Sequence, residues 1–518
     1  MNCCILKINW HDENSPVYSV DWQRYEVTGP LESINGEKNG ENPTKTPEIK
    51  RLVTGGGDNH IRLWRLDDEW TVNYTDSNEE DNYGPRVTYL STLVKHTQAV
   101  NAVKFSPQGL LASCSDDGSV IIWQKSPTLI KNIDNEFDDV ESWTVVKLIR
   151  SNAEVVDLDW SPCGKYLVTG SMDNIVRVYD ADSGNMIDHM TNHSHYVQGV
   201  SWDPKGEYIV SQSADKCMNV YKFKNGGTRL IYKNIRSEVP NYKLSEEDDG
   251  VVIGEKDGVE IISVDDDDKK EERGIKNKSL FHPETLQSFF RRLTFSPDGN
   301  LLVTPSGIFR YADGTETNTV YVFTRTNLNK PIVHLPGMSK PAVCISFSPA
   351  LYKRQSTELG VFDLPYKMIF AVATQDSVII YDTEKLEPLA VVNNLHYSTI
   401  TDMSWDGNKV IVSAADGFCS MIKFDNLGEL DMITTNGNTT NGITTNPITT
   451  NPITTNPITT NPITTNTNIS NTNNVNTNNT NTNNVNTNNT NINLTNPGVI
   501  KEKINSIDNL IRKKSKNV

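Results

Sequence analysis

Apolar and polar residues alternate in short runs along most of the chain, and seven of these runs end on an aromatic residue followed by a turn. Runs such as VNAVKF and YVQGVSW place an apolar side chain at every second position, a period that marks a half-buried β-strand. The pattern therefore predicts seven β-repeats. Their closing aromatic residues are Trp22, Phe105, Trp160, Trp202, Phe295, Phe347 and Trp405.

Six of the seven repeats continue in the same way, with a strand of small residues, an aspartate and a second apolar strand, as in LLASCSDDGSVIIW. A short carboxylate in such a turn can accept backbone N–H groups and fix the geometry between two strands. Four strands in a unit of about forty residues are typical of a WD-repeat β-propeller. The turn aspartates are Asp58, Asp117, Asp173, Asp215, Asp376 and Asp416.

The predicted fold is all-β, a seven-bladed WD-repeat β-propeller over residues 1–430 with a disordered Thr/Asn-rich C-terminal tail. An N-terminal strand at 4–10 is expected to pair beside residues 420–424 and close the last blade, which removes an open sheet edge. Tracts such as ITTNPITTNP hold almost no charge and nothing large to bury. The blades are centred near 17–64, 96–123, 153–180, 193–223, 289–323, 341–382 and 396–424; an acidic insertion at 224–280, a linker at 431–496 and a short basic tail at 497–518 complete the chain.

Charge is concentrated in the predicted loops. The formal net charge is −16, and residues 246–273 hold thirteen acids against four bases. Direct, sequence-specific binding of nucleic acid is not expected, because that needs a matching basic surface. A basic protein would be steered toward such loops, with Asp265, Asp266, Asp267 and Asp268 as candidate contacts. The alternative is that the acidic loops are only a solvated surface.

The chain offers little support for catalysis. Its seven cysteines are scattered without a C-x-x-C pair, so they are expected to be free thiols, and no metal or other cofactor is predicted. His96 and His193 precede inner strands and are expected to bond to Asp117 and Asp215 of their own blades. No nucleophile elbow or phosphate loop accompanies them, so an enzyme is not predicted. The chain lacks an apolar stretch of membrane-spanning length and a signal segment, which predicts a soluble, intracellular protein without membrane contact.

The fifth repeat departs from the others. It begins with SFFRRLTF, residues 288–295, and lacks the turn aspartate. Adjacent residues of a strand point to opposite faces, so Phe289 and Phe290 cannot easily both be buried. Exposed aromatic and arginine side chains together are typical of protein–protein hot spots. Phe289, Phe290, Arg291 and Arg292 are therefore candidate docking residues, with a purely structural role as the alternative.

The runs SFFRRLTFSPDGNLLVTPSG, HSHYVQGVSWDPKGEYIVSQSADK and INWHDENSPVYSVDW resemble the WD-repeat middle subunit of chromatin assembly factor one. The resemblance covers nearly all of residues 5–425. It implies a scaffold subunit of a nuclear complex that deposits the histone-three/histone-four pair on replicated or repaired DNA. The implied partners are the large and small subunits of the complex, these histones and the anti-silencing histone chaperone. Trp10 and His11, in the INWH run, are further docking candidates.

Three observations keep alternatives open. The family's basic motif for the anti-silencing chaperone is replaced here by a Thr/Asn tail that ends in LIRKKSKNV. Ile511, Arg512, Lys513 and Lys514 are thus a reduced chaperone motif, a nuclear-import signal or neither. A related replication-independent histone regulator is also a propeller, but FFRRL does not belong to its fifth blade. A substrate receptor of a cullin-type ubiquitin ligase would carry W/Y-D-x-R, whereas Asp182 and Glu384 stand at the arginine positions.

Overall fold

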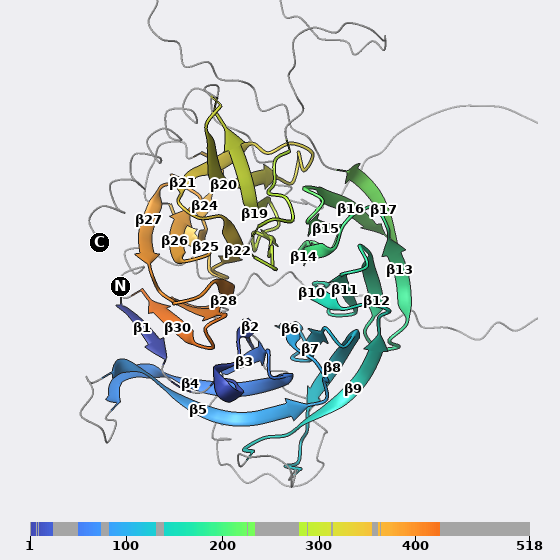
Figure 1. The fold of residues 1–518 in the computed structure, drawn as a ribbon, viewed down its shortest axis with the longest axis vertical. Helices are drawn as coiled ribbons and strands as arrows, with labels where there is room; N and C mark the ends of the chain where they lie inside the picture. The colour runs from blue at the N-terminus through green and yellow to red at the C-terminus, as the bar shows by residue number, and fades with distance from the viewer. Residues whose placement is uncertain are drawn as a thin grey trace, which may run out of the picture. The chain divides into compact units, whose positions relative to one another are not determined.

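A computed structural model describes residues 2–6, 8, 10–23, 50–73, 82–130, 139–224, 226–233, 279–286, 288–311, 314–354, 361–362 and 364–424. These residues belong to one compact unit and form seven four-stranded sheets arranged in a ring (Figure 1). The predicted seven-bladed propeller is confirmed. The Thr/Asn-rich tail, the linker and the basic tail lie outside the described residues.

In each of the first four blades the strands follow one another in chain order from the centre of the ring outward (Figure 1). Blade one contains β2 (Val17–Trp22), β3 (Arg51–Gly56), β4 (His60–Asn73) and β5 (Asn82–Val94); blade two contains β6 (Val100–Phe105), β7 (Leu111–Ser115), β8 (Ser119–Lys125) and β9 (Trp143–Arg150); blade three contains β10 (Val155–Trp160), β11 (Tyr166–Ser171), β12 (Val176–Asp180) and β13 (Met186–Met190); blade four contains β14 (Val197–Trp202), β15 (Tyr208–Ser213), β16 (Met218–Lys224) and β17 (Gly227–Lys233).

The last three blades depart from this regular order. Blade five has an inner strand of two residues, blade six carries an additional hairpin, and blade seven takes its outer strand from the N-terminus. Blade five contains β18 (Thr294–Phe295), β19 (Leu301–Arg310), β20 (Glu316–Thr324) and β21 (Val333–Met338); blade six contains β22 (Ala342–Phe347), β25 (Ile369–Thr374), β26 (Ser377–Asp382) and β27 (Pro388–Asn393), with the hairpin β23 (Tyr352–Lys353) and β24 (Tyr366–Lys367); blade seven contains β28 (Ile400–Asp406), β29 (Lys409–Ala414), β30 (Cys419–Lys423) and β1 (Asn2–Leu6), and a short 3₁₀ helix η1 spans Asp12–Asn14.

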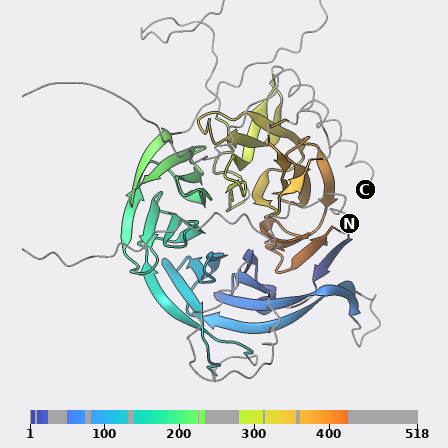
Figure 2. The same ribbon diagram turned by 180° about the vertical axis from the view of Figure 1, so that it is seen from behind.

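The two ends of the described chain meet in blade seven. Strand β1 pairs antiparallel with β30, with Cys4 opposite Met421, and Figure 2 shows the two strands side by side. The strand ends at Leu6, earlier than the predicted 4–10, so Trp10 and His11 lie beyond it. This pairing gives β30 a partner on its outer side, which an isolated blade would lack.

The hydrophobic core lies between neighbouring blades. Apolar side chains of one sheet pack against those of the next, as where the aromatic ring of Trp405 joins a cluster with Ile369 of blade six. Small residues allow this close approach: a Cβ added to Gly55 would lie 2.8 Å from a methyl group of Val100. The small-residue strands of the repeat therefore set the spacing between blades.

Two further sequence expectations concern thiols and membranes. All seven cysteines are free thiols, as predicted. Across the described ranges, no helix has the length and apolar character that a transmembrane segment requires.

Candidate interaction surface at the fifth blade

The turn of blade one shows how a regular repeat is held together. His11 Nδ1 lies 2.7 Å from Asp58 Oδ1, and His11 Nε2 lies 3.1 Å from Thr54 Oγ1. Trp64 Nε1 donates to the same hydroxyl at 3.0 Å, and Trp10 packs edge-on against Trp64. Trp10 and His11 are both buried. As docking candidates they are therefore misplaced, because their side chains are part of the core rather than the surface.

The same arrangement recurs in blades two and four. His96 Nδ1 lies 3.0 Å from Asp117 Oδ2, and His193 Nδ1 lies 2.9 Å from Asp215 Oδ2. The predicted bonds of both histidines are confirmed. Burial alone would raise the pKa of Asp117, but hydrogen bonds from His96 and Ser119 outweigh burial and lower this pKa.

Among the remaining turn aspartates, Asp416 repeats this arrangement in blade seven, where its Oδ2 lies 3.2 Å from His396 Nδ1. Asp173 pairs with Arg177 of the following strand. Asp376 instead accepts the hydroxyls of Thr374 and Ser377. In each case the aspartate binds residues of its own blade, which is a structural function.

In blade five, Arg291 makes contacts of a different kind. Its guanidinium donates to the carbonyl oxygens of Ser213 at 3.3 Å, His282 at 2.7 Å and Pro283 at 2.7 Å. The side chain is fully buried, and burial lowers the pKa of Arg291 to about 10. Arg291 thus fixes the segment that leads into blade five against the turn of blade four.

Arg292 lies at the middle of the ring and reaches three other blades. It donates to Asp402 of blade seven, to Ser19 Oγ of blade one at 3.1 Å and to the carbonyl oxygen of Asn101 of blade two at 2.7 Å. Its backbone N–H donates to the carbonyl oxygen of Val343 of blade six at 2.9 Å. Burial would lower the pKa of Arg292, but Asp402 and another buried carboxylate raise it. A single residue of blade five therefore joins blades one, two, six and seven.

The two phenylalanines have different environments. Phe290 is buried, with its ring 5.8 Å from that of Tyr18 and the Arg292 guanidinium 4.4 Å from its centroid. Phe289 is 39% exposed and stacks on Tyr196 at 6.2 Å. The expectation that FFRR forms a shared exposed rim is therefore wrong for Phe290, Arg291 and Arg292, which we call the fifth-blade anchor.

Short-range strand periodicity predicted one buried phenylalanine but missed the burial of both arginines. Their partners, three backbone carbonyl groups and Asp402, come from distant parts of the chain. One sequence signal of contacts between blades does exist. An aspartate precedes the closing tryptophan in VDW and LDW. These aspartates, Asp21 and Asp159, accept the backbone N–H of Phe105 and Trp202 on the next blade, both at 2.8 Å. Such acids mark contacts between blades.

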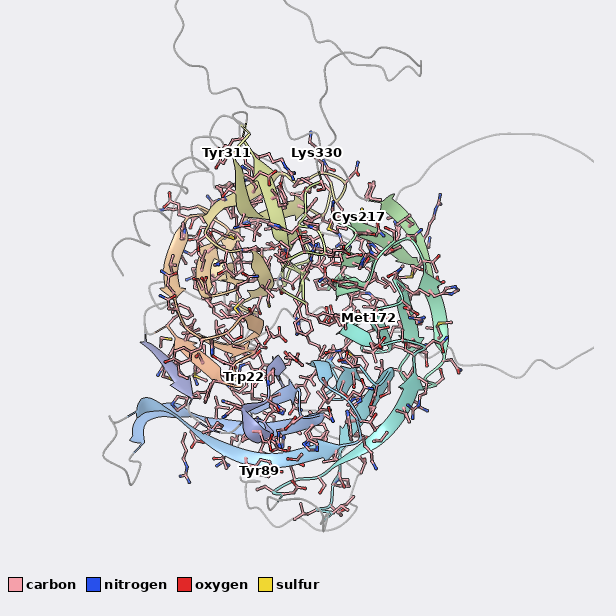
Figure 3. All side chains as sticks on the ribbon, in the orientation of Figure 1. Trp22, Tyr89, Met172, Cys217, Tyr311 and Lys330 are labelled. Carbon is pink, nitrogen blue, oxygen red and sulfur yellow. The ribbon has the colours of Figure 1, made fainter. Side chains whose placement is uncertain are left out.

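A cavity of about 330 Å³ lies at the centre of the ring and is lined by the inner strands of all seven blades. Figure 3 shows side chains from these strands directed toward the centre, with Trp22 labelled on blade one. Asp21, Asp159 and Asp402 line this cavity, and each already accepts backbone N–H groups. Burial raises the pKa of Asp159 to about 6. These carboxylates are thus engaged in holding neighbouring blades together.

One group of described residues has the spacing of a metal site. Ligand atoms of Asp12, Asp58 and His60 lie within 4.8 Å of one another. Arg62 is bonded to both carboxylates, so a guanidinium already supplies the positive charge that a cation would bring. The group does not fit a metal ion.

Two sets of candidate residues lie outside the described residues. They are Asp265, Asp266, Asp267 and Asp268 of the acidic insertion, and Ile511, Arg512, Lys513 and Lys514 of the basic tail.

Comparisons with known proteins agree with the propeller fold. Residues 1–430 match the family model of the CAF1B/HIR1 beta-propeller domain. The CAF1B subunit of chromatin assembly factor 1 from Saccharomyces cerevisiae is 36% identical over 82% of this chain and 86% of its own length. The subunit of the same name from Schizosaccharomyces pombe is 37% identical over 83% and 88%. Protein HIR1 of Kluyveromyces lactis is 26% identical over 74% of this chain and 40% of its own length. The chain therefore belongs to the CAF1B family of chromatin assembly factor 1 subunits.

Proposed function

We propose that this protein is a non-enzymatic scaffold subunit of a nuclear histone chaperone complex that assembles nucleosomes on newly replicated or repaired DNA. The observation that carries the proposal is the similarity to the CAF1B subunits of chromatin assembly factor 1 across the whole propeller. The related HIR1 protein of Kluyveromyces lactis matches at a lower identity of 26%. We therefore favour the replication-coupled function over the replication-independent one.

The described structure supports a scaffold rather than a moving part. Arg292 joins four other blades through buried hydrogen bonds, and β1 closes the ring through β30. The turn histidines that could suggest catalysis are engaged by aspartates of their own blades. A rigid ring of this kind can hold several partners at fixed positions around its surface.

The proposed partners are the large and small subunits of the complex and the histone-three/histone-four pair. Asp265, Asp266, Asp267 and Asp268 would shield basic histone surface, and DNA would then compete for the histones through its higher density of negative charge. Ile511, Arg512, Lys513 and Lys514 are the proposed contact with the anti-silencing chaperone; a nuclear-import signal and no binding role are the two alternatives for these residues.

Purification of the tagged full-length chain from nuclear extract tests this function directly. We expect both sister subunits and the histone pair in stoichiometric amounts, and deposition of histones on plasmid DNA by the purified complex. Recovery of a cullin adaptor without histones would replace the proposal by that of a ubiquitin-ligase receptor. Recovery of histones with the subunits of a HIR1 complex would favour the replication-independent function.

Phe289 remains the docking candidate of the FFRR motif, because its ring is exposed beside Tyr196. Replacement Phe289→Ala should weaken binding of the large subunit by about tenfold, as for a peripheral hot-spot residue. Tyr397→Ala is the matched control, since Tyr397 is an exposed aromatic residue in blade seven. Equal losses in both variants would show that the position of Phe289 has no special role.

A further inference from the structure

Four accessible side chains lie where the inner strands of blades one, two and three begin. Tyr18 is the second residue of β2, Asp116 follows β7, Glu154 precedes β10, and Met172, labelled in Figure 3, follows β11. None of the four is buried. We call this set the Tyr18 cluster. It lies at the opposite end of the inner strands from Trp22, which lines the central cavity.

Hydrogen bonds bring the acidic members of the cluster together. The side-chain amide of Asn101 donates to Asp116 Oδ1 at 2.6 Å and to the carbonyl oxygen of Val155 at 2.9 Å. Glu154 precedes Val155, and its carbonyl oxygen accepts the backbone N–H of Met172 at 3.0 Å. The turn of blade two is therefore held beside the entry to blade three.

The two carboxylates of the cluster repel each other. Burial raises the pKa of Asp116, and the negative charges of Glu154 and Asp117 raise it further, against a hydrogen bond that lowers it. In the described ranges neither Asp116 nor Glu154 forms an ion pair, whereas the neighbouring Asp117 is paired with His96. The cluster therefore carries negative charge that the described residues leave unbalanced.

The chain itself shows which side chain such a surface can bind. The guanidinium of Arg292 lies 4.4 Å from the centroid of the Phe290 ring and is paired with Asp402. The Phe290 ring lies 5.8 Å from the ring of Tyr18. The charge of Arg292 does not balance the cluster, because Asp402 and Asp157 surround it. Beside the cluster, an aromatic ring and a carboxylate thus already bind one arginine.

Charge and ring chemistry decide between the occupants that the cluster could bind. An acidic segment would be repelled by both carboxylates. An apolar segment would remove water from them without supplying a partner, which is unfavourable. An arginine would pair with the carboxylates, place its planar guanidinium on the ring of Tyr18 and pack its aliphatic part on Met172. A lysine would gain less, because its ammonium group is compact and strongly hydrated.

We propose that the Tyr18 cluster binds an arginine side chain in a basic segment of a partner protein. The guanidinium lies between Asp116 and Glu154, with one face against the ring of Tyr18. The buried ring of Phe290 separates this site from the exposed ring of Phe289. The inference goes beyond the proposed function, which assigns none of the four residues of the cluster to a partner.

Fluorescence anisotropy with the purified full-length chain tests the proposal. The probes are labelled octapeptides in which glycine alternates with arginine, with lysine or with glutamine. We expect the arginine peptide to bind about tenfold more tightly than the glutamine peptide, and also more tightly than the lysine peptide. Equal binding of the arginine and glutamine peptides would overturn the proposal.

Paired variants separate this site from the general attraction of a basic peptide to an acidic chain. Asp116→Asn combined with Glu154→Gln should weaken binding of the arginine peptide by about tenfold. Glu13→Gln combined with Asp182→Asn is the matched control, because it removes two exposed charges outside the cluster. The control should change binding by less than about twofold, since salt screens distant charges. Equal losses in the two double variants would show that only net charge attracts the peptide.

Two single variants decide the matter even if the double variant at the cluster fails to fold. Glu154→Gln changes an exposed side chain and should weaken binding of the arginine peptide by about threefold. Tyr18→Leu removes the ring but keeps an apolar side chain, and should also cost about threefold. Unchanged binding in either variant would overturn the proposal.

The basic tail of the same chain is the competing occupant. Arg512→Gln combined with Lys513→Gln should leave binding of the arginine peptide unchanged if the occupant belongs to a partner. A gain of about tenfold would show that the tail itself occupies the cluster, and the choice of a partner segment would then be wrong.

Discussion

The start of blade five and the outer edge of blade two both depart from the repeat, but in opposite directions. The fifth-blade anchor places two arginines and a phenylalanine inside the ring, each with 5% exposure or less. Around strand β9 of blade two, six apolar side chains are exposed, and we call them the blade-two patch: Leu129, Ile130, Val140, Val145, Val146 and Leu148. The sequence pattern instead predicted that the FFRR side chains are exposed and available to a partner.

The difference shows that residue type alone does not decide which irregularity is available to a partner. Arg291 and Arg292 are buried because carbonyl and carboxylate oxygens from several blades meet them. Val146 and Leu148 are exposed because their strand has no neighbour beyond it among the described residues. A charged side chain can be buried only where oxygen atoms bind it. An apolar side chain on an outer strand stays exposed where no further strand covers it.

The largest effect is expected at the anchor. Arg292→Met leaves the buried carboxylate of Asp402 without its cation, and breaking a buried pair in this way costs about 3–5 kcal/mol. Urea denaturation of the full-length chain should therefore show a clearly lower unfolding midpoint.

Arg310→Met is the matched control, because Arg310 pairs with the exposed Glu316 in the same blade. Because Arg310 also donates to the carbonyl oxygen of Ser279 at 2.7 Å, its loss should cost about 1–2 kcal/mol, still less than the loss of Arg292. If the two arginine variants unfold at the same urea concentration, the anchor does not hold the ring together.

A smaller loss is expected from Arg291→Met. The substitution removes hydrogen bonds to three carbonyl groups but leaves no buried charge behind, and bonds to a charged group contribute about 1.5–3 kcal/mol. Hydrogen exchange should accelerate in residues 279–286, which Arg291 fixes. Unchanged exchange there, with normal exchange elsewhere, would contradict this account of the side chain.

The fold was predictable because its signals are local. Alternation and the closing aromatic residues, such as Trp160, recur within each repeat, and the histidine-to-aspartate bonds stay within one blade. The anchor was not predictable in this way, because Arg292 meets Asp402 only once the ring has closed. Burial of a charge depends on long-range partners that no single strand contains.

Acid should act on blade two and on the start of blade five through different groups. The pKa of Asp117 in blade two is lowered on folding, so this carboxylate stabilises the folded state above its unfolded pKa of about 4. The contribution is lost as the pH falls below that value through the folded pKa. Arg291 binds only carbonyl groups and, with a pKa of about 10, stays charged throughout; acid acts on the segment that it fixes through His282 instead, whose pKa is lowered by burial.

Hydrogen exchange at pH 7 and pH 3, corrected for intrinsic rates, measures this contrast. The turn at 116–118 should open about tenfold more often in acid, because pH 3 lies about one unit below the unfolded pKa and one pKa unit corresponds to a factor of ten. Asp117→Asn should reduce the pH dependence of that turn. Slower exchange of this turn at pH 3 than at pH 7 would contradict the prediction.

The smallest effect on stability is expected at the blade-two patch, and it completes the contrast with the anchor. Val146→Glu combined with Leu148→Glu places two carboxylates where solvent already reaches both side chains, so no buried group loses a partner. Surface substitutions of this kind change the free energy of unfolding by about 0.5 kcal/mol or less. The urea midpoint should match that of the unchanged chain. A midpoint as low as that of Arg292→Met would mean that the patch is part of the core, and blade two would then resemble blade five.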